Sequence, residues 1–173
     1  TESKIGSNAV TSAKMFSGFA NGITMVDQWR LTASTNTSTS ADITTNWERV
    51  DNTFFEKIGT GMTETSGIFS FPSTGKYLVT EFWTINVASG DLADVIGKVT
   101  TDNSSYVFIT RNLIQASGGA EYNKLANQSF IDVTDISNVK MKWSSNSFAT
   151  NTALIGSTDD NRSCVSFLRI GDT

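Results

Sequence analysis

The side chains that could do chemistry in this chain are mostly carboxylates, because the sequence has no histidine and a single cysteine. Without histidine, serine–histidine and cysteine–histidine nucleophiles, histidine general bases and histidine-built metal sites are all excluded. Two carboxyl groups at a suitable separation could still hydrolyse a glycosidic bond. The spacing of the acidic residues singles out no pair, and most of them are expected to be solvated: Glu48, Asp51, Glu56, Glu64, Glu81 and Asp94. We therefore predict that the protein is not an enzyme, and a glycan-active enzyme is the third alternative.

One loop near the C-terminus contains hard oxygen ligands, in the sequence Asp159-Asp160-Asn161. Calcium prefers such ligands, so Asp159 and Asp160 are a candidate metal site. Consecutive aspartates followed by asparagine are also typical of an ordinary turn. We therefore expect no cofactor, with calcium as the alternative.

A sugar-binding platform would need an aromatic ring exposed on a loop. Tyr122 and Phe148 lie in polar surroundings and are the candidates for a ligand-facing role. Either ring could instead cover the edge of the core. The four tryptophans lie within strand patterns, so packing in the core is the expected role of each.

Composition limits the class of protein and its partners. Apolar residues make up 38% of the chain and charged residues 17%, and abundant Ser, Thr, Asn and Gly favour strands and turns. The net charge is −4 and no run of Lys or Arg occurs, so nucleic acid is not an expected partner. No apolar run approaches ~20 residues, so no membrane insertion is expected. The lone cysteine, Cys164, is expected to be a small buried side chain.

The strands that carry the candidate residues are predicted most clearly between Ser66 and Val87. Pro72 and Gly75 mark a turn between two apolar runs, so the stretch predicts two extended segments that meet across a turn. Side chains alternate along a strand, and in the second run both faces carry large apolar groups. Such a strand belongs in the middle of a sheet whose second side is covered by another sheet or another subunit.

About ten short strands separated by polar turns are predicted along the chain. Residues 92–100 and 106–113 flank an Asp-Asn turn and should form a hairpin. Further strands are expected at residues 27–32, 130–133, 139–143 and 165–170. This pattern predicts an all-β fold of sandwich or jelly-roll type, in one domain of residues 27–173. Residues 1–26 precede it, as either an anchoring arm or a leader packed on its own domain.

Residues 67–79, with the pattern Gly-Ile-Phe-Ser-Phe-Pro-x-x-Gly-x-Tyr-Leu-Val, resemble the heart of the globular C1q and tumour necrosis factor (TNF) superfamily of trimeric jelly rolls. Residues 129–143 resemble the strand, acidic turn and strand that follow in that family, and residues 155–168 resemble its closing strand. The resemblance covers residues 27 to 171. Cys164 and Ser166 depart from it, because the family usually has an aromatic and a glycine at these positions.

The resemblance implies a C1q/TNF-like, two-sheet jelly-roll sandwich that forms a homotrimer. It implies that one strand face packs around the threefold axis, with a trimer interface of Leu78, Thr80, Phe82, Cys164, Ser166 and Leu168. The predicted core consists of Trp29, Phe69, Phe71, Tyr77, Val79, Trp83, Ile85 and Phe167. Trimers of this family can hold calcium at or near the axis, which is a second reason to consider the metal.

The expected setting is a bacteriophage virion. Thr1 is a residue type that remains after removal of an initiator methionine, and residues 1–21 lack the layout of a signal peptide, so synthesis in a host cytosol is expected. The lack of disulfides and the Ser/Thr/Asn-rich loops resemble virion proteins that carry this fold. We predict a non-enzymatic structural or adhesive head, either a receptor-binding fibre tip for host attachment or a decoration of capsid or tail. Its expected partners are further copies of the same chain, other virion proteins and a cell-surface glycan or receptor. The alternative is a secreted C1q-like ligand-binding protein.

Overall fold

The computed structural model describes residues 22–35 and 40–173. The predicted anchoring arm, residues 1–26, lies mostly outside the described ranges. Within them, Met25 is buried in the core and Val26 begins the first strand. No helix in the described part of the chain is long and apolar enough to cross a membrane.

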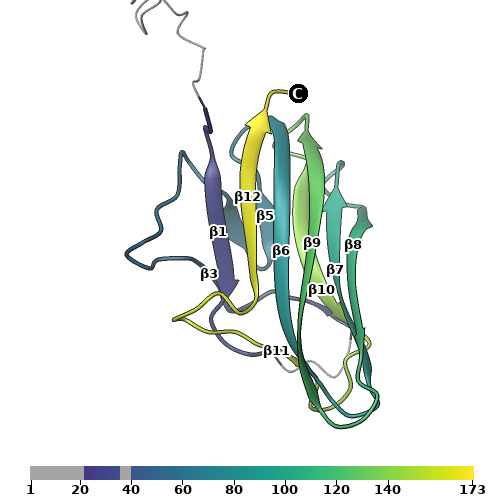
Figure 1. The fold of residues 1–173 in the computed structure, drawn as a ribbon. Coiled ribbons are helices and arrows are strands. Elements are labelled where there is room, and N and C mark those ends of the chain that lie inside the picture. Colours follow the sequence, from purple (N-terminus) through teal and green to yellow (C-terminus); the bar gives the residue numbers. More distant parts are fainter. Residues whose placement is uncertain (1–21, 36–39) are drawn as a thin grey trace, which may run out of the picture.

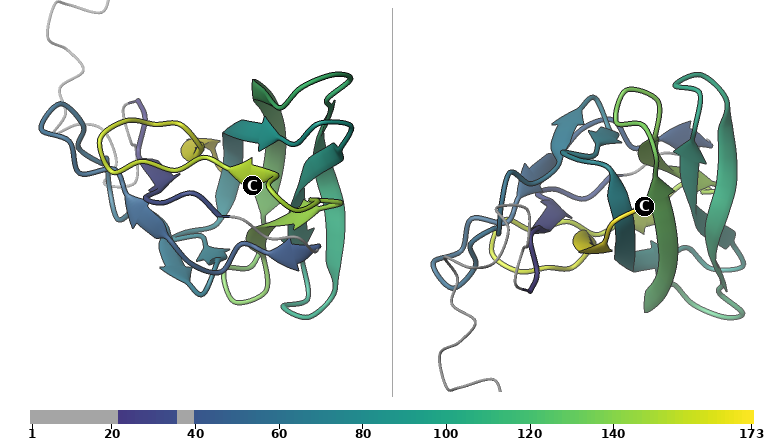
Figure 2. Two further views of the ribbon diagram at one scale, coloured as in Figure 1. Left: turned by 90° about the horizontal axis from the view of Figure 1, so that it is seen from below. Right: turned by 90° about the horizontal axis from the view of Figure 1, so that it is seen from above.

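Two antiparallel sheets form the two layers of a sandwich (Figures 1 and 2). Sheet A contains β1 (Val26–Leu31), β3 (Trp47–Arg49), β6 (Gly75–Val87), β9 (Glu121–Val133), β11 (Ala153–Leu154) and β12 (Cys164–Gly171). Sheet B contains β2 (Ala41–Asp42), β4 (Thr63–Thr65), β5 (Ile68–Ser70), β7 (Leu92–Thr100), β8 (Tyr106–Gln115) and β10 (Lys140–Asn146). The predicted all-β, two-sheet fold is confirmed.

Strand β6 occupies the middle of sheet A, as the sequence predicts (Figure 1). It pairs with β9 over its whole length, from Gly75 to Val87, and with β12 and β11 on its other side. Its side chains alternate between buried and partly or fully exposed, which is the pattern of a strand with one face on the core. The predicted hairpin of β7 and β8 is also confirmed.

The turn at Pro72–Gly75 has a different role from the one expected. The two segments that it joins do not pair, because β5 belongs to sheet B and β6 to sheet A. Gly75 has a φ of +141°, and a Cβ there would lie 2.6 Å from the carbonyl oxygen of Gly171. A side chain at this position would therefore collide with backbone, and glycine allows the chain to cross between the layers.

The core between the sheets is aromatic. All eight residues predicted for the core are buried, with exposed fractions of 9% or less. Phe69 lies at its centre, with ring centroids 5.3 Å from Trp143, 5.5 Å from Trp29 and 5.6 Å from Phe167. Edge and stacked contacts at these separations add to the stabilisation from burial alone.

Phe148 also belongs to this core, so the expectation that it faces a ligand is wrong. Only 2% of the residue is exposed, although it lies in a polar stretch. The loop around it is held to the domain by Asp91, whose Oδ2 accepts hydrogen bonds from the backbone N–H of Ala149 at 3.0 Å and from the hydroxyl of Thr152. These contacts satisfy the polar neighbours and leave the ring pointing inward.

Two acidic side chains that were expected to be solvated are buried instead. Glu81 points into the core, where its Oε2 accepts hydrogen bonds from Trp83 Nε1 at 2.7 Å and from Trp143 Nε1 at 2.8 Å. Because Trp143 lies on β10, this carboxyl group links the two sheets. Burial raises the pKa of Glu81, and the hydrogen bonds it accepts oppose that shift. Asp94 is fully buried and is paired with Arg111.

Candidate self-association surface

The six residues predicted for a trimer interface lie together on the outer side of sheet A, which we call the A face. Strands β6 and β12 run side by side there, and the register places the six residues in three directly opposed pairs. These pairs are Leu78 with Leu168, Thr80 with Ser166, and Phe82 with Cys164. The alternation of β6 and β12 directs all six away from the core, whose side chains come from the intervening positions.

Aromatic and aliphatic groups dominate the first of these rows. Phe130 on β9 lies opposite Leu78, and Val26 on β1 lies opposite Leu168, so one continuous apolar row crosses four strands. Phe130 in this row is 74% exposed, and Phe82 in the third row is 36% exposed. Large apolar side chains grouped in this way on a sheet surface mark a site of contact with another molecule.

Strand β9 is the part of this surface that the sequence did not predict. Only residues 130–133 were expected to be extended, whereas the strand begins at Glu121. Its outward positions alternate with half-buried ones, and they add Tyr122, Lys124, Ala126, Gln128 and Phe130 to the A face. The period-two alternation of these residues was the available signal, but Lys124 and Ala126 in its middle carry little strand preference alone.

The middle row of the A face is polar, but its groups bond to each other. Gln28 donates a hydrogen bond through Nε2 to Ser166 Oγ at 2.8 Å, and Gln128 donates through Nε2 to Thr80 Oγ1 at 3.2 Å. Asn161 donates in turn to Gln28 Oε1 at 3.1 Å. Polar groups that are already paired lose less free energy when water is removed from them.

The third row contains a shallow depression of about 500 Å³ beside Phe82. Cys164 lines it and is only 3% exposed, so it contributes little surface in spite of its outward direction. Burial raises the pKa of its thiol, and the positive charge of Lys124 only partly opposes the shift. Cys164 is therefore a neutral thiol at neutral pH, which suits the buried, unreactive role expected for it.

Charge is nearly absent from the three rows. None of the outward residues of β6, β9 and β12 in these rows is charged. Arg30 on β1 lies opposite Cys164, but it is buried and donates hydrogen bonds to Glu48 at 2.6 Å and to Asp51 at 2.9 Å. Its charge is thereby compensated within the subunit. Lys124, which lines the depression in the third row, is the charged group at the edge of these rows.

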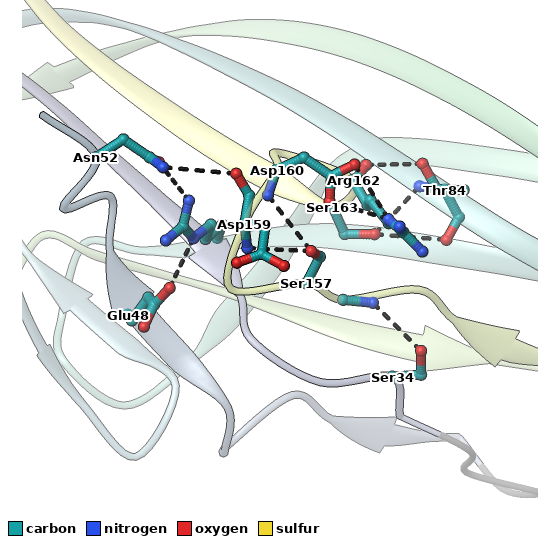
Figure 3. Close-up of polar contacts among 11 residues, drawn as sticks. Ser34, Glu48, Asn52, Thr84, Ser157, Asp159, Asp160, Arg162 and Ser163 are labelled. Carbon is teal, nitrogen blue, oxygen red and sulfur yellow. Dashed lines mark hydrogen bonds and ion pairs between the residues drawn. The ribbon is translucent and has the colours of Figure 1, made fainter. Parts of the chain in front are cut away.

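The loop with the candidate calcium ligands is an ordinary turn with its own polar contacts (Figure 3). Ser157 Oγ accepts hydrogen bonds from the backbone N–H groups of Asp159 at 3.1 Å and Asp160 at 3.3 Å. The carboxylate of Asp160 pairs with Arg162 at 3.0 Å, so it is not directed toward Asp159. In residues 22–35 and 40–173 no group of three or more acidic or cysteine side chains that could hold a metal ion is found. Calcium remains a prediction that this arrangement does not favour.

The remaining candidates have separate locations. Tyr122 is 71% exposed at the far end of the A face, opposite Asn86, so an exposed ring is present where the sequence suggested one. Five of the six acidic candidates bind groups within the chain. Glu48 and Asp51 hold Arg30, Asp94 holds Arg111, Glu81 binds two indoles, and Glu64 accepts a hydrogen bond from the Gly67 N–H.

Comparison with known proteins identifies the fold. No protein-family model matches the chain, and no curated protein is similar to it in sequence. Crystal structures of murine APRIL are similar, one with a TM-score of 0.62, 14% identity, and coverage of 84% of this chain and 98% of APRIL. The structure of Eiger TNF from S. frugiperda is similar with a TM-score of 0.64 and 13% identity, covering 88% of this chain and 96% of that one. At these identities the likeness establishes a TNF-like jelly-roll fold and nothing further.

Proposed function

We propose that this chain is a non-enzymatic head domain that assembles as a homotrimer through the A face and has a structural or adhesive role. The observation that carries the proposal is the uncharged apolar row of the A face, in which Phe130 is 74% exposed beside Leu78. A monomer would keep these groups in water. A second copy of the same chain is the simplest molecule that removes them from it.

Three copies fit this surface better than two. The sequence resembles a superfamily of trimeric jelly rolls, and the residues that the resemblance assigns to the axis form opposed pairs on the A face. Closed cyclic symmetry brings three copies of each residue to one axis, so an unpaired charge there is repeated threefold and opposes assembly. The uncharged side chains of β6, β9 and β12 in the three rows and the ion-paired Arg30 support such an axis, with Lys124 at the edge of the third row.

The setting that we favour is a virion, as a fibre tip or as a decoration of capsid or tail. Support comes from the core, which is closed by aromatic packing while the only cysteine is buried and free. Such a domain needs no oxidising compartment to fold, and it could therefore mature in a reducing cytosol. A secreted ligand-binding protein is the alternative, and a map of the purified particle containing the chain would distinguish the two.

The assembly is tested by light-scattering mass measurement on the full chain at micromolar concentration. We expect the mass of three chains, unchanged on moderate dilution. A monomer under these conditions would contradict the proposal, because the apolar rows would then be stable in water. A dimer would exclude the threefold axis.

A further inference from the structure

The outer side of sheet B, which we call the B face, carries a fixed cluster of charges that the self-association proposal does not use. Asp42 on β2 accepts a hydrogen bond at each carboxylate oxygen, from Lys98 Nζ at 3.1 Å and from Lys142 Nζ at 2.8 Å. Burial opposes ionisation of Asp42, but the two lysines outweigh it and hold its pKa below the ordinary value. The carboxylate of Asp42 is therefore charged, and each of its oxygens is held by one lysine ammonium group.

Aromatic rings complete the cluster. Lys142 Nζ lies 4.0 Å from the ring centroid of Tyr106, and Lys98 Nζ lies 5.5 Å from that of Phe108. Tyr106 is partly covered, whereas Phe108 is 65% exposed. An ammonium group near an aromatic ring is attracted to it, so Phe108 presents an apolar surface to solvent beside charged groups.

A depression of about 360 Å³ is lined by Phe108, Lys98 and Asp42 together with Ser144 and Asn146 of β10. This volume is within the range of small-molecule sites, ~300–1,000 Å³. The depression thus combines one exposed ring with hydroxyl, amide, carboxylate and ammonium groups. Ile96, which is 4% exposed, also lines it.

We propose that this depression binds a sugar ring of a glycan, with the apolar side of the ring on Phe108. Adjacent sugar hydroxyls both donate and accept hydrogen bonds. Asp42 supplies acceptors, and each lysine has three donors, of which Asp42 uses one. The inference deepens the proposed adhesive role and rests on it.

A saccharide fits the depression better than two other ligand classes. A phosphate or another small anion would need unopposed positive charge, whereas Asp42 already pairs with both lysines. An apolar peptide would have to cover the carboxylate and both ammonium groups without replacing their hydrogen bonds to water. The hydroxyl groups of a sugar can replace those hydrogen bonds to water.

Saturation-transfer NMR on the full chain tests this inference, with the methyl glycosides of glucose, galactose, N-acetylglucosamine and glucuronic acid as probes. We expect at least one of them to bind the wild type. Phe108→Ala should weaken that binding by about tenfold or more, as expected when a central aromatic contact is lost. Phe108→Trp should retain it, because the flat ring is kept. Leu113→Ala is the matched control, since Leu113 is 52% exposed on the same strand but does not line the depression.

Binding of none of the four probes would overturn the inference, and so would equal binding by wild type and Phe108→Ala. Mass measurement on the same samples separates this result from the assembly proposal. If the chains are trimeric but bind no sugar, the glycan site is wrong and the trimer stands. If a probe binds a monomer, the site stands and the trimer is wrong.

Discussion

On both outer faces of this sandwich, outward side chains alternate with inward ones along each strand. The two faces differ in how many charged side chains they expose. On the A face, the outward side chains of β6, β9 and β12 in the three rows are uncharged, Arg30 is buried against Glu48 and Asp51, and Lys124 lies at the edge. On the B face, Asp42, Lys98 and Lys142 form a partly exposed cluster with aromatic rings. One face is suited to lose its water to another copy of the chain, and the other is suited to stay hydrated.

The difference shows that exposed aromatics alone do not define a function. Phe130 and Phe108 are exposed to similar extents, 74% and 65%. Phe130 lies opposite a leucine, whereas Phe108 lies beside an ammonium group that is itself bonded to a carboxylate. The neighbours decide whether an exposed ring favours a protein interface or a polar ligand, because desolvating charge is costly and desolvating paired or apolar groups is not.

The largest expected effect comes from a charge on the A face. Phe82→Glu would bring three carboxylates together in a poorly hydrated site, where desolvation and like charge both oppose assembly. A cost of about 3 kcal/mol or more weakens assembly by at least about 100-fold. Light scattering should show monomer or aggregate.

Phe108→Glu is the matched control for that substitution, because it places the same charge on the B face. We expect it to remain trimeric. If Phe82→Glu stays trimeric, or if both variants dissociate equally, the two faces do not differ in the way described.

The next effect concerns the core that separates the two faces. Trp83→Ala should reduce the free energy of unfolding by about 3–5 kcal/mol, because a fully buried large aromatic and one hydrogen bond to Glu81 are lost. Chemical denaturation measures the loss. Tyr122→Ala, at an exposed ring, should change stability by about 0.5 kcal/mol or less. A loss below about 1 kcal/mol for Trp83→Ala would contradict its buried position.

A smaller effect depends on pH and on the carboxyl group that links the sheets. The pKa of Glu81 is raised above its ordinary value of 4.5 by burial, so the folded state holds a proton that the unfolded state has released. Stability of the wild type should therefore fall as pH rises from 4.5 through the raised pKa. The side chain of Glu81→Gln does not titrate, and its amide oxygen can still accept hydrogen bonds from the indole N–H groups of Trp83 and Trp143.

The stability of Glu81→Gln relative to wild type should therefore be higher at pH 8 than at pH 4 in urea denaturation. Glu81→Ala should be less stable than wild type at both pH values, because it leaves two indole N–H groups unpaired. A wild type and a Glu81→Gln variant with parallel pH profiles would show that Glu81 titrates as it does in the unfolded chain.

The smallest effect is expected at the charge cluster of the B face. Asp42→Asn should cost about 1 kcal/mol or less, because ion pairs with solvent access contribute little. The difference should shrink further in 1 M salt, where screening is strong. A loss above about 2 kcal/mol would indicate that the cluster is needed for folding, which would weaken its interpretation as a ligand site.

The sequence by itself determined the fold class and the direction of each side chain on β6. Both follow from local chemistry: β-branched and aromatic residues favour strands, and alternation on a strand has a period of two wherever the strand lies. The turns at Asp102-Asn103 and at Pro72–Gly75 depend on a few residues that are adjacent in the sequence, so the positions of these turns could also be predicted. For the same reason the predicted interface residues of β6 and β12 share one face.

Only the tertiary structure decided the features that depend on residues distant in the chain. The first half of β9 is extended because β6 supplies its partner, and Phe148 is buried because Asp91, 58 residues before Ala149, holds its loop. Glu81 is an internal link because Trp143 reaches it across 62 residues, and the B-face cluster joins Asp42 to Lys142 across 100. Contacts of this kind cannot be recognised in the neighbouring sequence, because the polar group of each residue could equally well form its hydrogen bonds with water.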